Sequence, residues 1–161
     1  MITVVADSGV LVSAHLQDEP THECSLALVR ALAEGSVRWL APTLLPYEFT
    51  NAMLKALRAG RLEEESLELR IAETAKLAVL PVAVDQIGVQ AAARRLGRSA
   101  YDASYIALAE QLGAPFITAD RRLYNAVHEA LPWVIWIEDW SDQLDLAEDP
   151  LAGGAGKGDQ L

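Results

Sequence analysis

Four acidic residues of the sequence stand in apolar or small-residue surroundings, apart from its charged stretches. Asp7 and Asp120 each come directly after a short apolar run, whereas Glu48 and Asp102 each lie near the start of a segment with apolar residues at helical spacing. Acids are seldom found in segments suited to burial unless a partner compensates their charge. These four carboxylates are therefore the candidates for chemistry.

Carboxylates that converge repel one another and stay ionised together only around a cation. Hard oxygen ligands of this kind suit Mg²⁺, with Mn²⁺ as a second choice. Such an ion can generate a hydroxide nucleophile from water and neutralise charge on a phosphoryl oxygen. The four acids together thus predict metal-dependent hydrolysis of a phosphodiester bond.

Each acid also has a purely structural interpretation. Asp7 and Asp120 can cap the helices that follow them, and Glu48 and Asp102 can be favourable charges near helix N-termini. These alternatives stay open for any one residue. The combination of four acids, two of them at strand ends, favours the metal site.

The order of the secondary-structure elements must bring these acids together. Apolar and β-branched runs predict strands, and apolar residues at helical spacing, ended by Gly35, Gly60 and Gly113, predict helices. The predicted strands are 2–6, 37–41, 79–82, 115–119 and 133–137, and the predicted helices are 21–34, 44–57, 62–77, 85–96, 101–112 and 121–129. Pro81 indicates that 79–82 is an edge strand.

Short strands that alternate with helices predict parallel pairing. We therefore expect an α/β fold, a three-layer sandwich with a short, mainly parallel central sheet flanked by helices. In open parallel sheets, functional groups collect at the carboxyl ends of the strands. Asp7 and Asp120 stand at two such ends.

Composition limits the class of protein. With 161 residues, 52% of them apolar, the chain is expected to form one domain with a closed core. We expect that domain to span residues 1–145 and an acidic, Gly-rich flexible tail to span 146–161. The N-terminus lacks the basic region of a signal peptide, and no apolar stretch approaches ~20 residues without charge. We therefore expect a cytoplasmic protein with no membrane segment.

A net charge of −10 does not attract polyanions, so contact with nucleic acid must depend on a local basic patch or on bound metal. Arg121 and Arg122 follow Asp120 directly, and three more arginines precede Asp102. Arginine suits phosphate because its planar fork can bond two oxygens at once. We predict that Arg121 and Arg122 contact RNA, the alternative being a solvated helix face.

Other residue types carry less chemistry. The single cysteine excludes an internal disulfide and a zinc site built on several thiolates, and the three histidines lack metal-ligand spacing. The tryptophans at 133, 136 and 140 could stack on bases, but their place in and after an apolar strand favours core or dimer packing.

Taken together, the motifs resemble those of the PIN domain family and, within it, the VapC-type toxin ribonucleases. Residues 4–8 resemble the family's first strand and its catalytic aspartate, and residues 45–51 resemble its helix with a conserved glutamate. Residues 101–109 and 116–123 are close to the family's most recognisable stretch. The resemblance covers residues 2 to about 137.

The resemblance implies roles for individual residues. The family's acidic metal-binding quartet matches Asp7, Glu48, Asp102 and Asp120, and polar positions that support these acids match Ser8 and Thr118. The implied activity is that of a Mg²⁺-dependent endoribonuclease, the toxin of a type II toxin–antitoxin system. Its product ends would be a 5′-phosphate and a 3′-hydroxyl.

The resemblance also implies partners, namely an RNA substrate, a cognate antitoxin and a second copy of the chain in a homodimer. Relatives bind an antitoxin tail in a groove over the active site, and the apolar helices between residues 44 and 80 are the expected surface here. One alternative is a PIN-fold nuclease that acts on DNA or in RNA processing without an antitoxin. Another is a catalytically idle metal- or RNA-binding module, which would have no reason to keep four repelling carboxylates together.

Overall fold

The computed structural model describes residues 1–143, so the tail predicted at 146–161 lies outside the described residues. A single sheet of five strands runs through the middle of this part of the chain, in the order β3-β2-β1-β4-β5. The strands are β1 (Ile2–Ala6), β2 (Val37–Pro42), β3 (Leu80–Val82), β4 (Phe116–Thr118) and β5 (Val134–Trp136). Each neighbouring pair is parallel. The mainly parallel sheet predicted from the sequence is confirmed, and β3 lies at its edge as Pro81 indicated.

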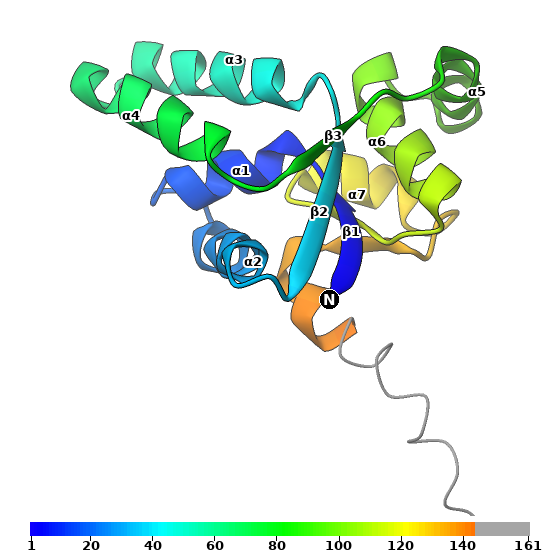
Figure 1. Cartoon of the computed structure of the whole chain (residues 1–161). Helices are drawn as coiled ribbons and strands as arrows, with labels where there is room; N and C mark the ends of the chain where they lie inside the picture. The colour runs from blue at the N-terminus through cyan, green and yellow to red at the C-terminus, as the bar shows by residue number, and fades with distance from the viewer. Residues whose placement is uncertain (144–161) are drawn as a thin grey trace, which may run out of the picture.

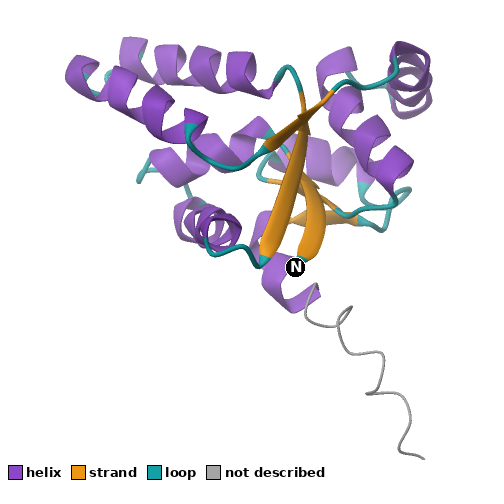
Figure 2. Cartoon of the chain, in the orientation of Figure 1, coloured by secondary structure: helices purple, strands orange, loops and turns teal. Residues whose placement is uncertain are grey.

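Helices cover both faces of the sheet (Figures 1 and 2), which confirms the three-layer sandwich. The helices are α1 (Ser8–His15), α2 (His22–Ala33), α3 (Leu45–Arg58), α4 (Glu64–Ala75), α5 (Gln86–Leu96), α6 (Ala100–Leu112) and α7 (Arg121–Val127), with a 3₁₀ turn η1 (Ile137–Asp139) after β5. In Figure 1, α1 and α2 lie on one side of β1 and β2, and α5 and α6 lie on the other.

The helix α1 is the element that periodicity does not reveal. It is only 8 residues long, and Val10, Leu11 and Val12 follow one another without a polar interruption. A short helix with apolar residues on several faces has no amphipathic pattern to detect. The sequence indicated only its start, at the capping residue Asp7.

The helix α6 is buried along most of its length. Every residue from Ala103 to Ala109 is buried, because the helix packs between α5 and the sheet. The Ser99 side chain caps its first turn by accepting a hydrogen bond from the Asp102 backbone N–H, and Gly113 ends it in the left-handed conformation with φ 60°. The two caps fix where Asp102 lies relative to the sheet.

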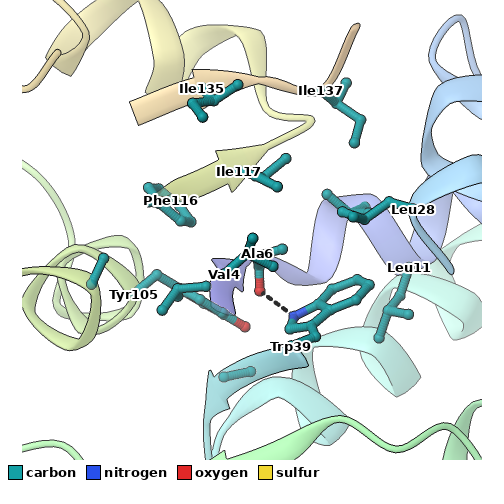
Figure 3. Close-up of a cluster of buried hydrophobic side chains, with 14 of the residues drawn as sticks. Val4, Ala6, Leu11, Leu28, Trp39, Tyr105, Phe116, Ile117, Ile135 and Ile137 are labelled. Carbon is teal, nitrogen blue, oxygen red and sulfur yellow. Dashed lines mark hydrogen bonds between the residues drawn. The ribbon is translucent and has the colours of Figure 1, made fainter. Parts of the chain in front are cut away.

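The core directly beneath the strand ends is built around Trp39 on β2. Its side chain is fully buried, and its indole Nε1 donates a hydrogen bond of 3.1 Å to the carbonyl oxygen of Ala6, the last residue of β1 (Figure 3). This bond holds the backbone immediately before Asp7. Within residues 1–143, no helix is long and apolar enough to cross a membrane.

Because this bond is buried, Trp39→Phe should destabilise the fold more than Trp136→Phe. Both tryptophans are buried, but the Trp136 Nε1 has no hydrogen-bond partner among the described residues. The phenylalanine at 39 leaves the Ala6 carbonyl unpaired, which costs about 1–2 kcal/mol in addition to the lost packing. Urea unfolding of both variants measures the difference, and equal losses of stability would show that the bond contributes nothing.

Candidate active site

The neighbouring strands β1 and β4 both lead to an aspartate at the same edge of the sheet. Ala6 pairs with Ile117, and the Asp7 backbone N–H donates to the Ile117 carbonyl at 3.2 Å. Asp120 lies two residues beyond the end of β4. The register of a parallel pair therefore brings the two acids to one edge, as the sequence predicted.

Asp7 is a buried carboxylate held by two donors. Its side chain has 6% of its surface exposed. The Val10 backbone N–H donates to Oδ1 at 3.2 Å, and the Thr118 hydroxyl donates to Oδ2. A Cβ at Gly9 would lie only 3.0 Å from Asp7 Oδ1, so a larger residue there would crowd the carboxylate.

The pKa of Asp7 is raised to about 7, chiefly by burial and to a lesser extent by the nearby charge of Asp120, while the hydrogen bonds from Thr118 and Val10 act in the opposite direction. The carboxylate forms no ion pair with a basic side chain among residues 1–143. The fold thus holds a partly desolvated acid without a counter-ion from its own described side chains.

Glu48 lies in the first turn of α3 and accepts a hydrogen bond of 2.5 Å from the Tyr105 hydroxyl of α6. The nearby Ser8 side chain lowers the pKa of both Glu48 and Tyr105. Burial raises the pKa of Glu48, and the charge of Asp102 acts in the same direction, although the hydrogen bonds oppose it. Ser8 therefore acts on Glu48, while Thr118 contacts Asp7.

Asp102 lies in the first turn of α6, where it forms an ion pair with Arg98. The Arg98 Nη2 is 3.1 Å from Asp102 Oδ2, and both side chains are about one-quarter exposed, at 26% and 28%. Asp120 is more exposed and caps α7, because its Oδ1 accepts hydrogen bonds from the Arg122 and Leu123 backbone N–H groups. The capping interpretation of Asp120 and Asp7 is thus correct, but it does not exclude a second role.

The four acids are coupled through their charges in two pairs. Asp120 acts on the pKa of Asp7, and Asp102 acts on that of Glu48. Within residues 1–143, no three side chains of histidine, cysteine, aspartate or glutamate are grouped closely enough to hold a metal ion. Asp102 instead contacts Arg98, and Asp120 contacts its own helix. The donor set itself fits Mg²⁺ or Mn²⁺, since it consists of carboxylate oxygens and includes a buried acid without a counter-ion.

The two arginines expected to contact RNA differ in their surroundings. The Arg121 guanidinium carbon lies 3.5 Å from the centre of the Trp136 ring and 5.8 Å from that of Tyr124. Arg122 is exposed. Arg121 is therefore already engaged in a cation–π contact, which no local sequence pattern predicts.

Two further residues of the site received no role from the sequence, namely Tyr105 and Arg98. Tyr105 follows Asp102 by three residues, so both lie on neighbouring positions of one helix face, and Arg98 precedes Asp102 by four. This spacing is the signal that could have associated them with the site. It could not have revealed Glu48 as the partner of Tyr105, because the two residues are 57 positions apart.

Because folding raises the pKa of Asp7, the protonated acid stabilises the fold and the ionised acid destabilises it. The stabilisation is complete below about pH 4 and is lost as the pH rises through about 7. We expect a contribution on the order of 4 kcal/mol across this interval. Asp7→Asn cannot ionise, so the variant should be more stable than the wild type at pH 8.

This prediction is tested by urea unfolding at pH 5 and pH 8 in EDTA, with the exposed Asp139→Asn as the control. The control should follow the wild type at both pH values. The assignment would be wrong if Asp7→Asn lost stability between pH 5 and pH 8 as steeply as the wild type does.

Comparison with known proteins identifies the family. The PIN domain model matches residues 4–129. Ribonuclease VapC3 of Pyrobaculum aerophilum is 27% identical over 124 residues, which cover 74% of this chain and 91% of that protein.

Three solved structures share the fold. PAE2754 from Pyrobaculum aerophilum has a TM-score of 0.64 and 22% identity, covering 90% of this chain and 98% of its own. VapC20 of Mycobacterium tuberculosis, described as a toxin that cleaves the sarcin–ricin loop, has a TM-score of 0.54 and 16% identity over 77% of this chain and 95% of its own. VapBC2 from Rickettsia felis, bound to a fragment of its promoter DNA, has a TM-score of 0.57 and 10% identity, covering 84% of this chain and 97% of its own.

The family model spans the described fold from β1 to α7 and includes all four acids of the site. The parallel sheet and the two aspartates at its carboxyl edge agree with that match. The chain belongs to the PIN domain family.

Proposed function

We propose that this protein is a metal-dependent endoribonuclease. The observation that carries the proposal is the buried, uncompensated Asp7 at the carboxyl edge of the sheet, where the charge of Asp120 acts on it, together with the second coupled pair of acids, Glu48 and Asp102. Such an arrangement costs folding free energy, so a structural role alone does not account for it. The relative named as a ribonuclease supports RNA as the substrate.

Asp7, Asp102 and Asp120 would hold the metal directly or through water, and Glu48 would complete the shell or orient the attacking water. A bound Mg²⁺ or Mn²⁺ would lower the pKa of water and neutralise charge on the phosphoryl oxygens. Thr118 would keep the Asp7 carboxylate oriented through its hydroxyl. Asp102 would have to exchange its contact with Arg98 for one with the metal.

RNA binding would depend on local contacts, because the net charge of −10 opposes binding of a polyanion. The exposed Arg122 is available for phosphate at the start of α7, beside Asp120. Arg121 would add positive charge at the RNA-binding surface while it stays stacked on the Trp136 ring. Binding to generic RNA should be weak and salt-sensitive, which favours recognition of RNA shape or of single-stranded segments.

The purified protein should cleave a structured RNA pool with Mg²⁺ or Mn²⁺ and lose this activity in EDTA. Asp102→Asn should lower the rate by at least a hundredfold, since it removes a ligand charge at the site. The exposed Asp139→Asn on η1 should cleave like the wild type. Gel analysis of end-labelled RNA measures all three.

The outcomes separate the alternatives. Activity that survives in Asp102→Asn would remove the support for this site. Metal binding without RNA cleavage would favour the idle binding module, and cleavage of DNA in preference to RNA would favour a PIN-fold nuclease that acts on DNA.

We further propose that the protein is the toxin of a toxin–antitoxin pair and that its antitoxin binds an apolar groove beside the site. A cavity of about 300 Å³ lies between α3, α4 and the β2–β3 edge of the sheet. Apolar side chains dominate its lining, including Leu11, Leu45, Phe49, Ile71, Leu77 and Val79. The groove begins within one helical turn of Glu48, and the VapBC2 complex supports a partner of this kind. A homodimer, expected from the sequence, stays a prediction.

Ala75→Arg tests the groove, because Ala75 is exposed on α4 and lines the cavity. The variant should cleave RNA normally but resist inhibition by the product of a small neighbouring open reading frame. Ala72→Arg, exposed on the same helix outside the cavity lining, should remain inhibited. Inhibition assays with the co-purified partner measure both, and equal inhibition of the two variants would exclude this groove.

A further inference from the structure

Tyr105 is the one buried tyrosine whose hydroxyl reaches a carboxylate of the site in the described part of the chain. Its side chain is 2% exposed and comes from α6, one turn after Asp102. Figure 3 shows it extending from α6 toward β1 with the hydroxyl oxygen at its leading end. The hydroxyl donates to Glu48 Oε2 at 2.5 Å.

The position of this hydroxyl is fixed by packing. The Tyr105 ring is stacked on Phe116 of β4, with 6.0 Å between ring centres and an interplanar angle of 18°. Both residues lie in the main hydrophobic core. A tyrosine has only two side-chain torsions, so a buried ring stacked on a neighbouring ring places its hydroxyl with little freedom.

The position of Glu48 on α3 does not by itself fix the orientation of its carboxylate. Its side chain is half-buried and has three torsions, so without a partner its carboxylate could adopt several orientations. In the contact between the two residues the Tyr105 hydroxyl is the donor and Glu48 Oε2 is the acceptor, so the carboxylate is held from a fixed point in the core. The nearby Ser8 side chain acts on both groups.

We propose that Tyr105 is a positioning residue that orients Glu48 for the metal site, and that this contact links α6 to α3. The inference rests on the proposed metal-dependent function. Tyr105 is not a catalytic residue in this account, because it acts only through Glu48. One Oε atom of Glu48 is occupied by the tyrosine, which leaves the other for metal or water.

The competing account is that Glu48 merely satisfies a buried hydroxyl. A structural contact of that kind predicts that loss of the hydroxyl changes stability but not metal affinity. A positioning contact predicts weaker metal binding, and only while the Glu48 carboxylate is present. The two accounts therefore differ in a double-mutant cycle.

The experiment measures Mn²⁺ affinity by titration calorimetry for the full chain, Tyr105→Phe, Glu48→Gln and the double variant. Tyr105→Phe keeps the ring that packs on Phe116 and removes only the donor. We expect about tenfold weaker Mn²⁺ binding in Tyr105→Phe, in line with the loss of a residue that orients a ligand. In the Glu48→Gln background the same change should alter the affinity by less than twofold.

Tyr124→Phe is the matched control. Tyr124 is half-buried on α7, where its ring stacks on His128 with 4.6 Å between centres. Removal of the hydroxyl in Tyr124→Phe should leave Mn²⁺ affinity unchanged. RNA cleavage adds a second readout, in which Tyr105→Phe should lower kcat at fixed Mn²⁺ and leave KM for RNA unchanged.

Three results would overturn the proposal. One is wild-type Mn²⁺ affinity in a folded Tyr105→Phe variant, and another is an equal loss of affinity in both backgrounds. The third is failure of Tyr105→Phe to fold, which would make the hydroxyl a structural group. If the wild type itself binds no Mn²⁺ and cleaves no RNA, the proposed function fails instead, and the two failures are thereby distinguished.

Discussion

Keeping the Asp7 carboxylate away from water is the constraint on which the rest of the structure depends. The acid stands at the end of the central strand, where Val4, Val5 and Ala6 before it are fully buried. Ionising it there is unfavourable, and the charge of Asp120 adds to the cost. The hydroxyl of Thr118 and the first turn of α1 limit that cost without removing it.

Contacts from several surrounding elements stabilise the other three acids. Tyr105 contacts Glu48, Arg98 contacts Asp102, and the helix N-terminus of α7 contacts Asp120. The acids thus have three kinds of partner, namely hydroxyls, a guanidinium and backbone N–H groups. These partners come from separate segments of the chain, so the folded sheet is required before the carboxylates can share one region.

Much of this arrangement follows from local sequence, and the limits have a physical reason. The strand ends at Asp7 and Asp120 could be predicted because the apolar runs before them are short and distinct, and Pro81 marked the edge strand correctly. The helix α1 escaped prediction because eight largely apolar residues carry no period. The Tyr105–Glu48 contact and the stacking of Arg121 on Trp136 depend on how distant elements pack, which no local pattern encodes.

The edge strand β3 has a consequence for how the protein can assemble. The Val82 carbonyl accepts from the Thr43 N–H on the inner side of the strand, so the backbone of the adjacent Pro81 faces outward. A proline offers no N–H there, so the free edge is a poor template for another strand. Growth of the sheet across subunits is disfavoured at this edge. A partner beside β3 would therefore be held by side-chain packing and not by an extended backbone ladder.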